Sequence, residues 1–128
     1  MLHPAVPHGE KSHDVGVTDD ARRLLAKVIG DQDFDGRDEL LAQVPYVEVV
    51  GGPVTFRKIG VDRQCVPRSD TSLERVPGEA WAFGDDGQPI GTLVVWIDDG
   101  YISALEYGWV SDAAPTELPN PDKVRSRR

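Results

Sequence analysis

The sequence lacks several features that would point to a compartment other than the cytoplasm. It has a single cysteine, Cys65, among 128 residues, so an internal disulfide is excluded and a reducing compartment is expected. No apolar run approaches the roughly 20 residues that a membrane-spanning helix needs, and the N-terminus lacks the apolar stretch of a secretory signal peptide. We therefore expect a cytoplasmic protein with no membrane partner.

Recognisable catalytic motifs are missing as well. The sequence contains no nucleophile elbow, phosphate-binding loop, dinucleotide fingerprint or zinc-ligand spacing. All three histidines, His3, His8 and His13, lie close to the N-terminus, so the rest of the chain has no histidine to serve as a base beside a nucleophile. We expect no catalytic residues, no cofactor and no metal site, and an enzyme is the less favoured class.

Positive charge is scarce, because 14 Lys and Arg against 22 Asp and Glu give a net charge of −8. Nucleic-acid binding requires clustered Lys and Arg to neutralise phosphates, so we do not expect a nucleic-acid partner. The stretch 79–112 contains no Lys or Arg and seven acids, namely Glu79, Asp85, Asp86, Asp98, Asp99, Glu106 and Asp112. An acidic surface steers a basic partner, so a basic protein is the expected partner.

The stretch 79–110 contains all three tryptophans and predicts three strands joined by tight turns. The dipeptides Asp86-Gly87 and Asp99-Gly100 tolerate the positive φ that such turns require. The segment 90–97 is apolar on both faces, which is typical of a central strand covered on both sides. In the strand 101–109, strict alternation places one set of side chains on each face. The sets are Tyr101, Ser103, Leu105, Tyr107 and Trp109 against Ile102, Ala104, Glu106 and Gly108.

The N-terminal half supplies helices to cover this sheet. Residues 1–17, rich in His, Pro and Gly, are expected to form a disordered tail. Thr18 is the expected N-cap of a helix that ends at Gly30, and a second helix is expected over 37–44, ended by Pro45. Strands are expected over 46–50 and 54–59. Whether the irregular segment 60–78 contains a further strand is left open.

These elements predict an α+β domain over residues 18–112. Two N-terminal helices pack on an antiparallel sheet of about five strands, which ends in a three-strand meander. Residues 113–128 contain three prolines and end in a basic cluster. We expect them to form an extended surface segment with a basic tail.

Six residues are candidates for a binding surface. Glu106 lies in a strand that we expect to be half buried, and a buried carboxylate needs a donor such as Tyr, Trp or Arg. The acids at the 98–99 turn and three aromatic residues near them complete the set. The candidates are Glu106, Asp98, Asp99, Trp96, Trp109 and Tyr107.

Two further sequence patterns are weak evidence for a functional site. Asp31, Asp33, Asp35 and Gly36 match the first half of an EF-hand loop, but the twelfth position, which should supply a bidentate Glu, is an alanine, so we expect no calcium site. Cys65 has two arginines nearby in sequence, which would favour the thiolate, but its role is left open.

The step Leu105-Glu106-Tyr107 and the segment 118–121, Leu-Pro-Asn-Pro, resemble the C-terminal end of a group of small uncharacterised single-domain bacterial proteins of the high-GC, actinobacterial type. The helical opening DDARRLLAKVIG followed by DFDGRDELLAQV is similar too. The resemblance implies a shared fold and brings no known activity.

Two functions are consistent with these residues. The first is a protein-interaction module that docks on a basic partner, in the manner of immunity or inhibitor proteins; it loses support if the acids of 79–112 lie on separate tips. The alternative is a small-molecule-binding domain or small enzyme with an aromatic-lined pocket between helices and sheet, formed by residues such as Trp81, Trp96, Tyr107 or Trp109. The oligomeric state is left open.

Overall fold

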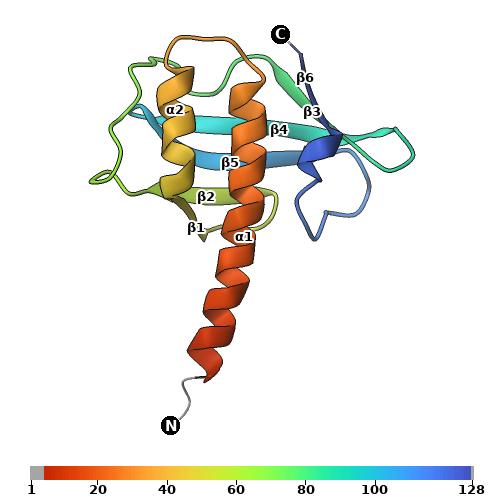
Figure 1. The fold of residues 1–128 in the computed structure, drawn as a ribbon. Helices are drawn as coiled ribbons and strands as arrows, with labels where there is room; N and C mark the ends of the chain where they lie inside the picture. Colours follow the sequence, from red (N-terminus) through yellow and green to blue (C-terminus); the bar gives the residue numbers. More distant parts are fainter. Residues whose placement is uncertain (1–4, 128) are drawn as a thin grey trace.

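Two helices cover one face of a six-stranded antiparallel sheet in the computed structural model, which describes the backbone of residues 5–127 and the side chains of 16–127 (Figure 1). The predicted α+β class and the antiparallel sheet are confirmed. The strand order is β1-β2-β5-β4-β3-β6. The helices are α1 (Ala5–Gly30) and α2 (Arg37–Gln43); the strands are β1 (Val47–Gly51), β2 (Phe56–Val61), β3 (Glu79–Phe83), β4 (Pro89–Asp98), β5 (Tyr101–Trp109) and β6 (Val124–Arg127).

The sheet has one strand more than expected. Residues Val124–Arg127, which the sequence analysis assigns to an extended tail, form β6 and pair antiparallel with β3. Val124 is 1% exposed, so this short strand is anchored in the core by its first residue. The strands β3, β4 and β5 are consecutive neighbours, but they occupy the middle of the sheet and do not end it. The first two residues of the segment 60–78 extend β2, and the rest of it contributes only an isolated bridge, between Arg75 and Trp96.

Helix α1 begins at Ala5, well before the expected N-cap Thr18. Pro7 is compatible with this start, because the first four N–H groups of a helix have no partner within it. Residues 5–17, which were expected to belong to a disordered tail, are therefore part of α1, and residues 1–4 lie outside the described residues. Thr18 does not cap the helix; its Oγ1 accepts a hydrogen bond of 3.2 Å from the N–H of Val49 in β1. One turn later, Arg22 donates to the carbonyl oxygen of Val47 at 2.8 and 3.1 Å, so α1 satisfies backbone groups of the edge strand β1.

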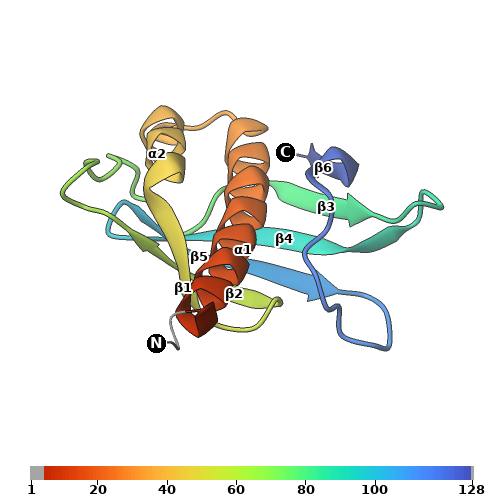
Figure 2. The same cartoon turned by 60° about the horizontal axis from the view of Figure 1, so that its bottom comes forward.

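The core lies between the helices and one face of the sheet. Leu24, Leu25 and Ile29 of α1 are fully buried, and the alternate residues Leu93 and Val95 of β4 face them. Burying one such side chain contributes about 1.5–3 kcal/mol. Both helices lie on this side (Figure 2), so the expectation that the central strand is covered on both faces is wrong for the described residues.

A bulge in β5 changes which side chains face the helices. The register shifts between Trp96 and Ile97, so that Trp96 pairs with Ala104 but Ile97 pairs with Ile102, and Ser103 is the extra residue. Directly opposed residues share a face, so Ile102 joins the covered face of Leu93 and Val95 and is 1% exposed. The expected grouping of Ile102 with Ala104 and Glu106 is therefore wrong, because strict alternation does not survive a bulge.

One buried amide connects α2 to the turn between β4 and β5. Gln43 is completely buried. Its Nε2 donates to the carbonyl oxygens of Gly100 at 2.8 Å and Pro67 at 3.3 Å, and its Oε1 accepts from the N–H of Ile102 at 3.0 Å. All three partners are backbone groups, so one side chain ties the end of α2 to the turn and to the segment before Ser69.

We predict that Gln43→Leu lowers the free energy of unfolding by about 1–3 kcal/mol, because a leucine of similar volume leaves the buried N–H of Ile102 without its acceptor and removes one of the two donors to the carbonyl oxygen of Gly100. Urea denaturation followed by tryptophan fluorescence measures this. The control is Gln88→Leu at an exposed turn, which should stay within about 0.5 kcal/mol of the wild type. Equal stabilities of the two variants would contradict the role given to Gln43.

Candidate functional site

The six candidate residues are divided between the two faces of the sheet. Tyr107 pairs with Leu93 and Trp109 with Gly91, so both belong to the face that the helices cover. Tyr107 is 3% exposed, and burial raises its pKa. The rings of Trp81 and Trp96 belong to the uncovered face, since Trp81 pairs with Thr92. The aromatic residues proposed for a pocket between helices and sheet therefore do not line one cavity.

Glu106 and Trp96 form a hydrogen-bonded pair on the uncovered face. The indole N–H of Trp96 donates to Glu106 Oε1 at 2.9 Å. Val94 lies directly opposite Glu106, so Trp96 reaches the carboxylate diagonally from the next position on that face. Both side chains are half-buried. The pair fixes the orientation of the Trp96 ring.

A hollow of about 420 Å³ at the end of β4 brings Trp96 together with the two candidate aspartates. We call it the acidic hollow. Three carboxylates and one arginine line it, and Arg68 forms an ion pair of 3.2 Å with Asp99. The lining residues are Arg68, Thr71, Ser72, Leu73, Glu74, Trp96, Ile97, Asp98, Asp99, Gly100 and Ser103.

Two of these lining residues, Arg68 and Glu74, were missed by the sequence analysis. They come from the segment 60–78, which has no hydrophobic period, and nothing in the sequence indicates which strand it approaches. Two backbone hydrogen bonds hold this segment against the end of β4. The N–H of Ser69 donates to the carbonyl oxygen of Gly100 at 2.8 Å, and the N–H of Ile97 donates to the carbonyl oxygen of Glu74 at 2.8 Å. Gly100 has φ 78°, and a Cβ on it would lie 2.4 Å from the carbonyl oxygen of Ser69, so a glycine is required here.

The loop between α1 and α2 adds further acids beside the acidic hollow. The hydroxyl of Ser69 donates to the carbonyl oxygen of Gly36 at 2.9 Å and to Glu39 Oε1 at 3.3 Å. Asp33 and Asp35, in the EF-hand-like loop, are exposed. Gly36 has φ 90°, and Ser69 Oγ would lie 2.4 Å from a Cβ there, so this contact accounts for the glycine of that motif. Among the described residues, no three His, Cys, Asp or Glu side chains converge on a common point.

The acids of the stretch 79–112 do not share one surface. Asp98 and Asp99 lie at the C-terminal end of β4, whereas Asp85 and Asp86 lie just before its N-terminal end. The one-signed stretch of sequence is therefore divided between two turns, and the expectation that its acids form one docking surface loses its support. The acidic end of the molecule instead combines the 98–99 turn with the loop between the helices, which is distant in sequence.

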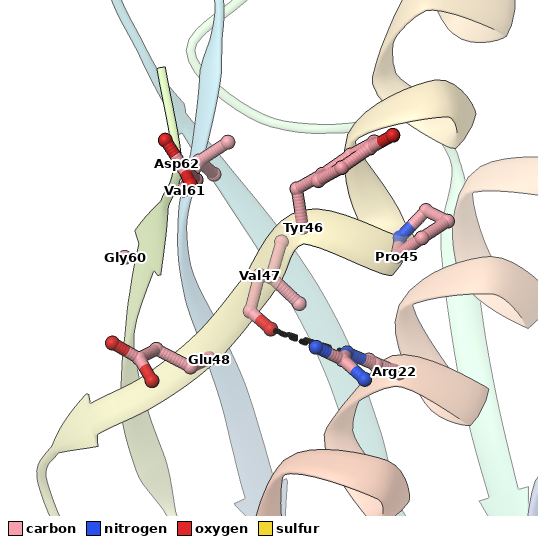
Figure 3. Close-up of a pocket in the computed structure, with 8 residues that line it drawn as sticks. All are labelled: Arg22, Pro45, Tyr46, Val47, Glu48, Gly60, Val61 and Asp62. Carbon is pink, nitrogen blue, oxygen red and sulfur yellow. Dashed lines mark hydrogen bonds between the residues drawn. The ribbon is translucent and has the colours of Figure 1, made fainter. Parts of the chain in front are cut away.

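A second hollow, of about 490 Å³, lies beside the edge strand β1 (Figure 3). Its polar side chains do not converge, because Glu48 and Asp62 extend from one side of it and Tyr46 points away from them (Figure 3). Arg22, on the far side, is occupied by the carbonyl oxygen of Val47. This arrangement holds an edge strand and offers no group aimed at a ligand.

Cys65 does not have the environment of a reactive thiolate. Its thiol donates to Asp62 Oδ2 at 3.2 Å. This hydrogen bond to Asp62, more than desolvation, raises the pKa of the exposed thiol above its usual value, which is the opposite of the effect that nearby arginines would have. Arg63 instead stacks on the ring of Tyr101, 4.3 Å from its centroid.

Comparison of the chain with protein-family models, with curated proteins and with solved structures found no match. The resemblance to small bacterial proteins stays a prediction. Neither helix, over its described residues, is both long and apolar enough to cross a membrane.

We predict different effects of two substitutions at Glu106. Glu106→Gln keeps an oxygen that accepts from Trp96 and should change the free energy of unfolding by less than about 0.5 kcal/mol. Glu106→Ala leaves the half-buried indole N–H unpaired and should cost about 1 kcal/mol. Urea denaturation measures both. Glu79→Ala, at an exposed glutamate on the same face, is the matched control and should be neutral; a cost equal to that of Glu106→Ala would disprove the pairing.

We also predict that Asp62→Ala speeds alkylation of Cys65. The raised pKa leaves less thiolate near neutral pH, and removing the carboxylate that holds the proton lowers the pKa and increases the reactive fraction. The pH dependence of the rate with iodoacetamide should shift to lower pH in this variant. Asp70→Ala, which removes another exposed carboxylate, should leave the profile unchanged. Coincident profiles for all three proteins would show that Asp62 does not control the thiol.

Proposed function

We propose that this protein is an interaction module that docks on a basic protein through the acidic hollow. The observation that carries the proposal is the joining of Trp96, Glu74 and Asp98 in one hollow at the end of β4. An oriented aromatic ring beside carboxylates suits a cationic side chain, which gains from the ring face and from the negative charge together.

The charge balance around the hollow supports this reading. Asp99 is paired with Arg68, and Arg75, opposite Trp96, adds a second positive charge on its border. Glu74 and Asp98 form no ion pair within the described residues. With Asp33 and Asp35 of the neighbouring loop also exposed, the end of the molecule keeps an excess of negative charge that steers a basic surface.

An immunity or inhibitor protein is one example of such a module. Its target would offer a lysine or arginine for the hollow and a wider basic surface for the neighbouring loop. Electrostatic complementarity of this kind raises the association rate and disfavours acidic competitors. The alternative, a small-molecule-binding domain or small enzyme, has less support, because its proposed aromatic residues lie on opposite faces of the sheet.

Binding of a hexaarginine peptide tests the proposal in a matched way. Asp98→Asn with Asp99→Asn should weaken binding about fivefold, since each exposed ion pair contributes about 0.2–1 kcal/mol. Asparagine tolerates the positive φ of 51° at position 99. Asp85→Asn with Asp86→Asn removes the same charge from the other end of β4 and should have little effect. Calorimetry at low and at physiological salt measures both.

An equal loss of affinity in the two double variants would show that binding depends only on net charge. It would contradict a binding site at the acidic hollow. Cellular partners are then identified by affinity capture, with the same two double variants as baits. A genuine partner is retained by the Asp85/Asp86 variant and lost by the Asp98/Asp99 variant.

A further inference from the structure

Strand β6 forms one border of the sheet, where β3 is its only partner among the described strands (Figure 1). It is held at both ends. At its start, Val124 is buried, and its N–H donates to the carbonyl oxygen of Pro121. At its end, the carbonyl oxygen of Arg127 accepts from Nε2 of the buried Gln32 at 3.0 Å. This border is therefore already formed as a strand, and a partner that binds there does not have to order it.

Strand β3 divides its backbone groups between β4 and β6. Val95 of β4 accepts a hydrogen bond from Val76, which precedes β3. Because alternate residues of a strand direct their backbone groups to the same side, Leu93 faces β3 as well. Ala80 is the partner of Leu93, so the backbone groups of Ala80 are used by β4. The residues on either side of Ala80 therefore direct theirs towards β6.

The alternation continues into β6 and leaves the backbone of Ser126 facing outwards. Arg125 and Arg127 lie opposite the two residues of β3 that bond towards β6, so they use their own backbone groups on β3. Val124 and Ser126 then face away from the sheet, in agreement with the bond from the N–H of Val124 to Pro121. Within residues 5–127, no hydrogen bond outside the sheet reaches the backbone of Ser126. One N–H and one carbonyl oxygen are thus open to an incoming strand.

The side chains of Arg125 and Arg127 flank this open position on the uncovered face. Both are exposed, and neither forms an ion pair within the described chain, although the protein has an excess of acids. Glu79 lies opposite Arg127 without pairing with it. The two arginines also border a hollow of about 240 Å³, which is lined by Trp81, Phe83, Pro89, Arg125 and Arg127. An apolar wall beside the arginine stems keeps their charged ends at the surface.

We propose that an extended acidic segment of a partner protein adds to the sheet as a further strand beside β6. One of its residues lies opposite Ser126 and exchanges two backbone hydrogen bonds with it. The residues before and after that one are acids, which lie opposite Arg125 and Arg127 on the uncovered face. In strand addition, the backbone bonds provide affinity and the alternate side chains provide specificity, so the pattern recognised is an acid, any residue, and an acid.

The spacing and the charge of the two arginines favour this occupant. Alternate side chains of a strand are about 6.8 Å apart, the same in β6 as in a strand laid beside it, so both acids meet an arginine at once. A second copy of β6 would instead place arginine opposite arginine, and like charges directly opposite each other destabilise a sheet. A small free anion would use the arginines but leave the backbone of Ser126 unpaired. The site is separate from the acidic hollow and requires a partner of opposite charge.

Fluorescence anisotropy with a labelled peptide in which glutamate alternates with threonine tests the strand addition. The wild type should bind this peptide. A peptide of the same composition with all glutamates consecutive should bind about fivefold more weakly, because consecutive side chains point to opposite faces and only one of each pair can meet an arginine. N-methylation of the threonines, one of which lies opposite Ser126, should abolish binding. N-methylation of the glutamates affects only the outer side of the added strand and should preserve it.

Paired variants of the protein test the role of the arginines. Arg125→Gln with Arg127→Gln should weaken binding of the alternating peptide by about tenfold, because two pairs of opposite charges across the strands are lost. The control is Arg23→Gln with Lys58→Gln, which removes the same charge at exposed positions of α1 and β2 and should leave the affinity unchanged.

Four results would each overturn the inference. They are no binding of the alternating peptide at about 1 mM, equal affinities for the alternating and consecutive peptides, equal affinities for the two methylated peptides, and equal losses in the two double variants. The Arg125/Arg127 variant should still bind hexaarginine, and the Asp98/Asp99 variant should still bind the alternating peptide. The proposed function and the strand addition therefore succeed or fail independently.

Discussion

The arrangement of the β4–β5 turn depends on one buried amide, that of Gln43. Gln43, at the end of α2, binds backbone groups from both the β4–β5 turn and the segment before Ser69. These two segments form the walls of the acidic hollow. Because a buried polar group is stable only when its partners are in place, the amide specifies one arrangement of the turn, where apolar packing alone would accept several.

The sheet separates stability from recognition. Its covered face holds the apolar core, and its uncovered face presents tryptophans, carboxylates and arginines in register. The bulge at Ser103 allows β5 to serve both faces, since it directs Ile102 into the core while Ala104 and Glu106 stay on the other side. Trp96, Asp98 and Glu106 are thus carried by the central strands, whose positions the core fixes.

The parts of the fold that follow local rules were predictable from the sequence. The Asp-Gly turns and apolar runs locate β3 to β5, and the need of Glu106 for a donor follows from its place in a half-buried strand. Its actual donor, Trp96, depends on the register, which the unexpected bulge shifts. Strand β6 was missed because the four residues VRSR read as a basic tail, and their pairing with β3 is a contact between distant parts of the chain. Glu74 reaches the hollow for the same non-local reason.

The hydrogen bonds from Thr18 and Arg22 to strand β1 have a consequence for aggregation of the protein. An edge strand with free backbone groups is a template for strand addition and aggregation. Here two side chains one helical turn apart occupy the N–H of Val49 and the carbonyl of Val47, so an incoming strand finds neither group available. Helix α1 therefore blocks strand addition at β1. Local unfolding of this part of α1 would expose an aggregation-prone edge before the core unfolds.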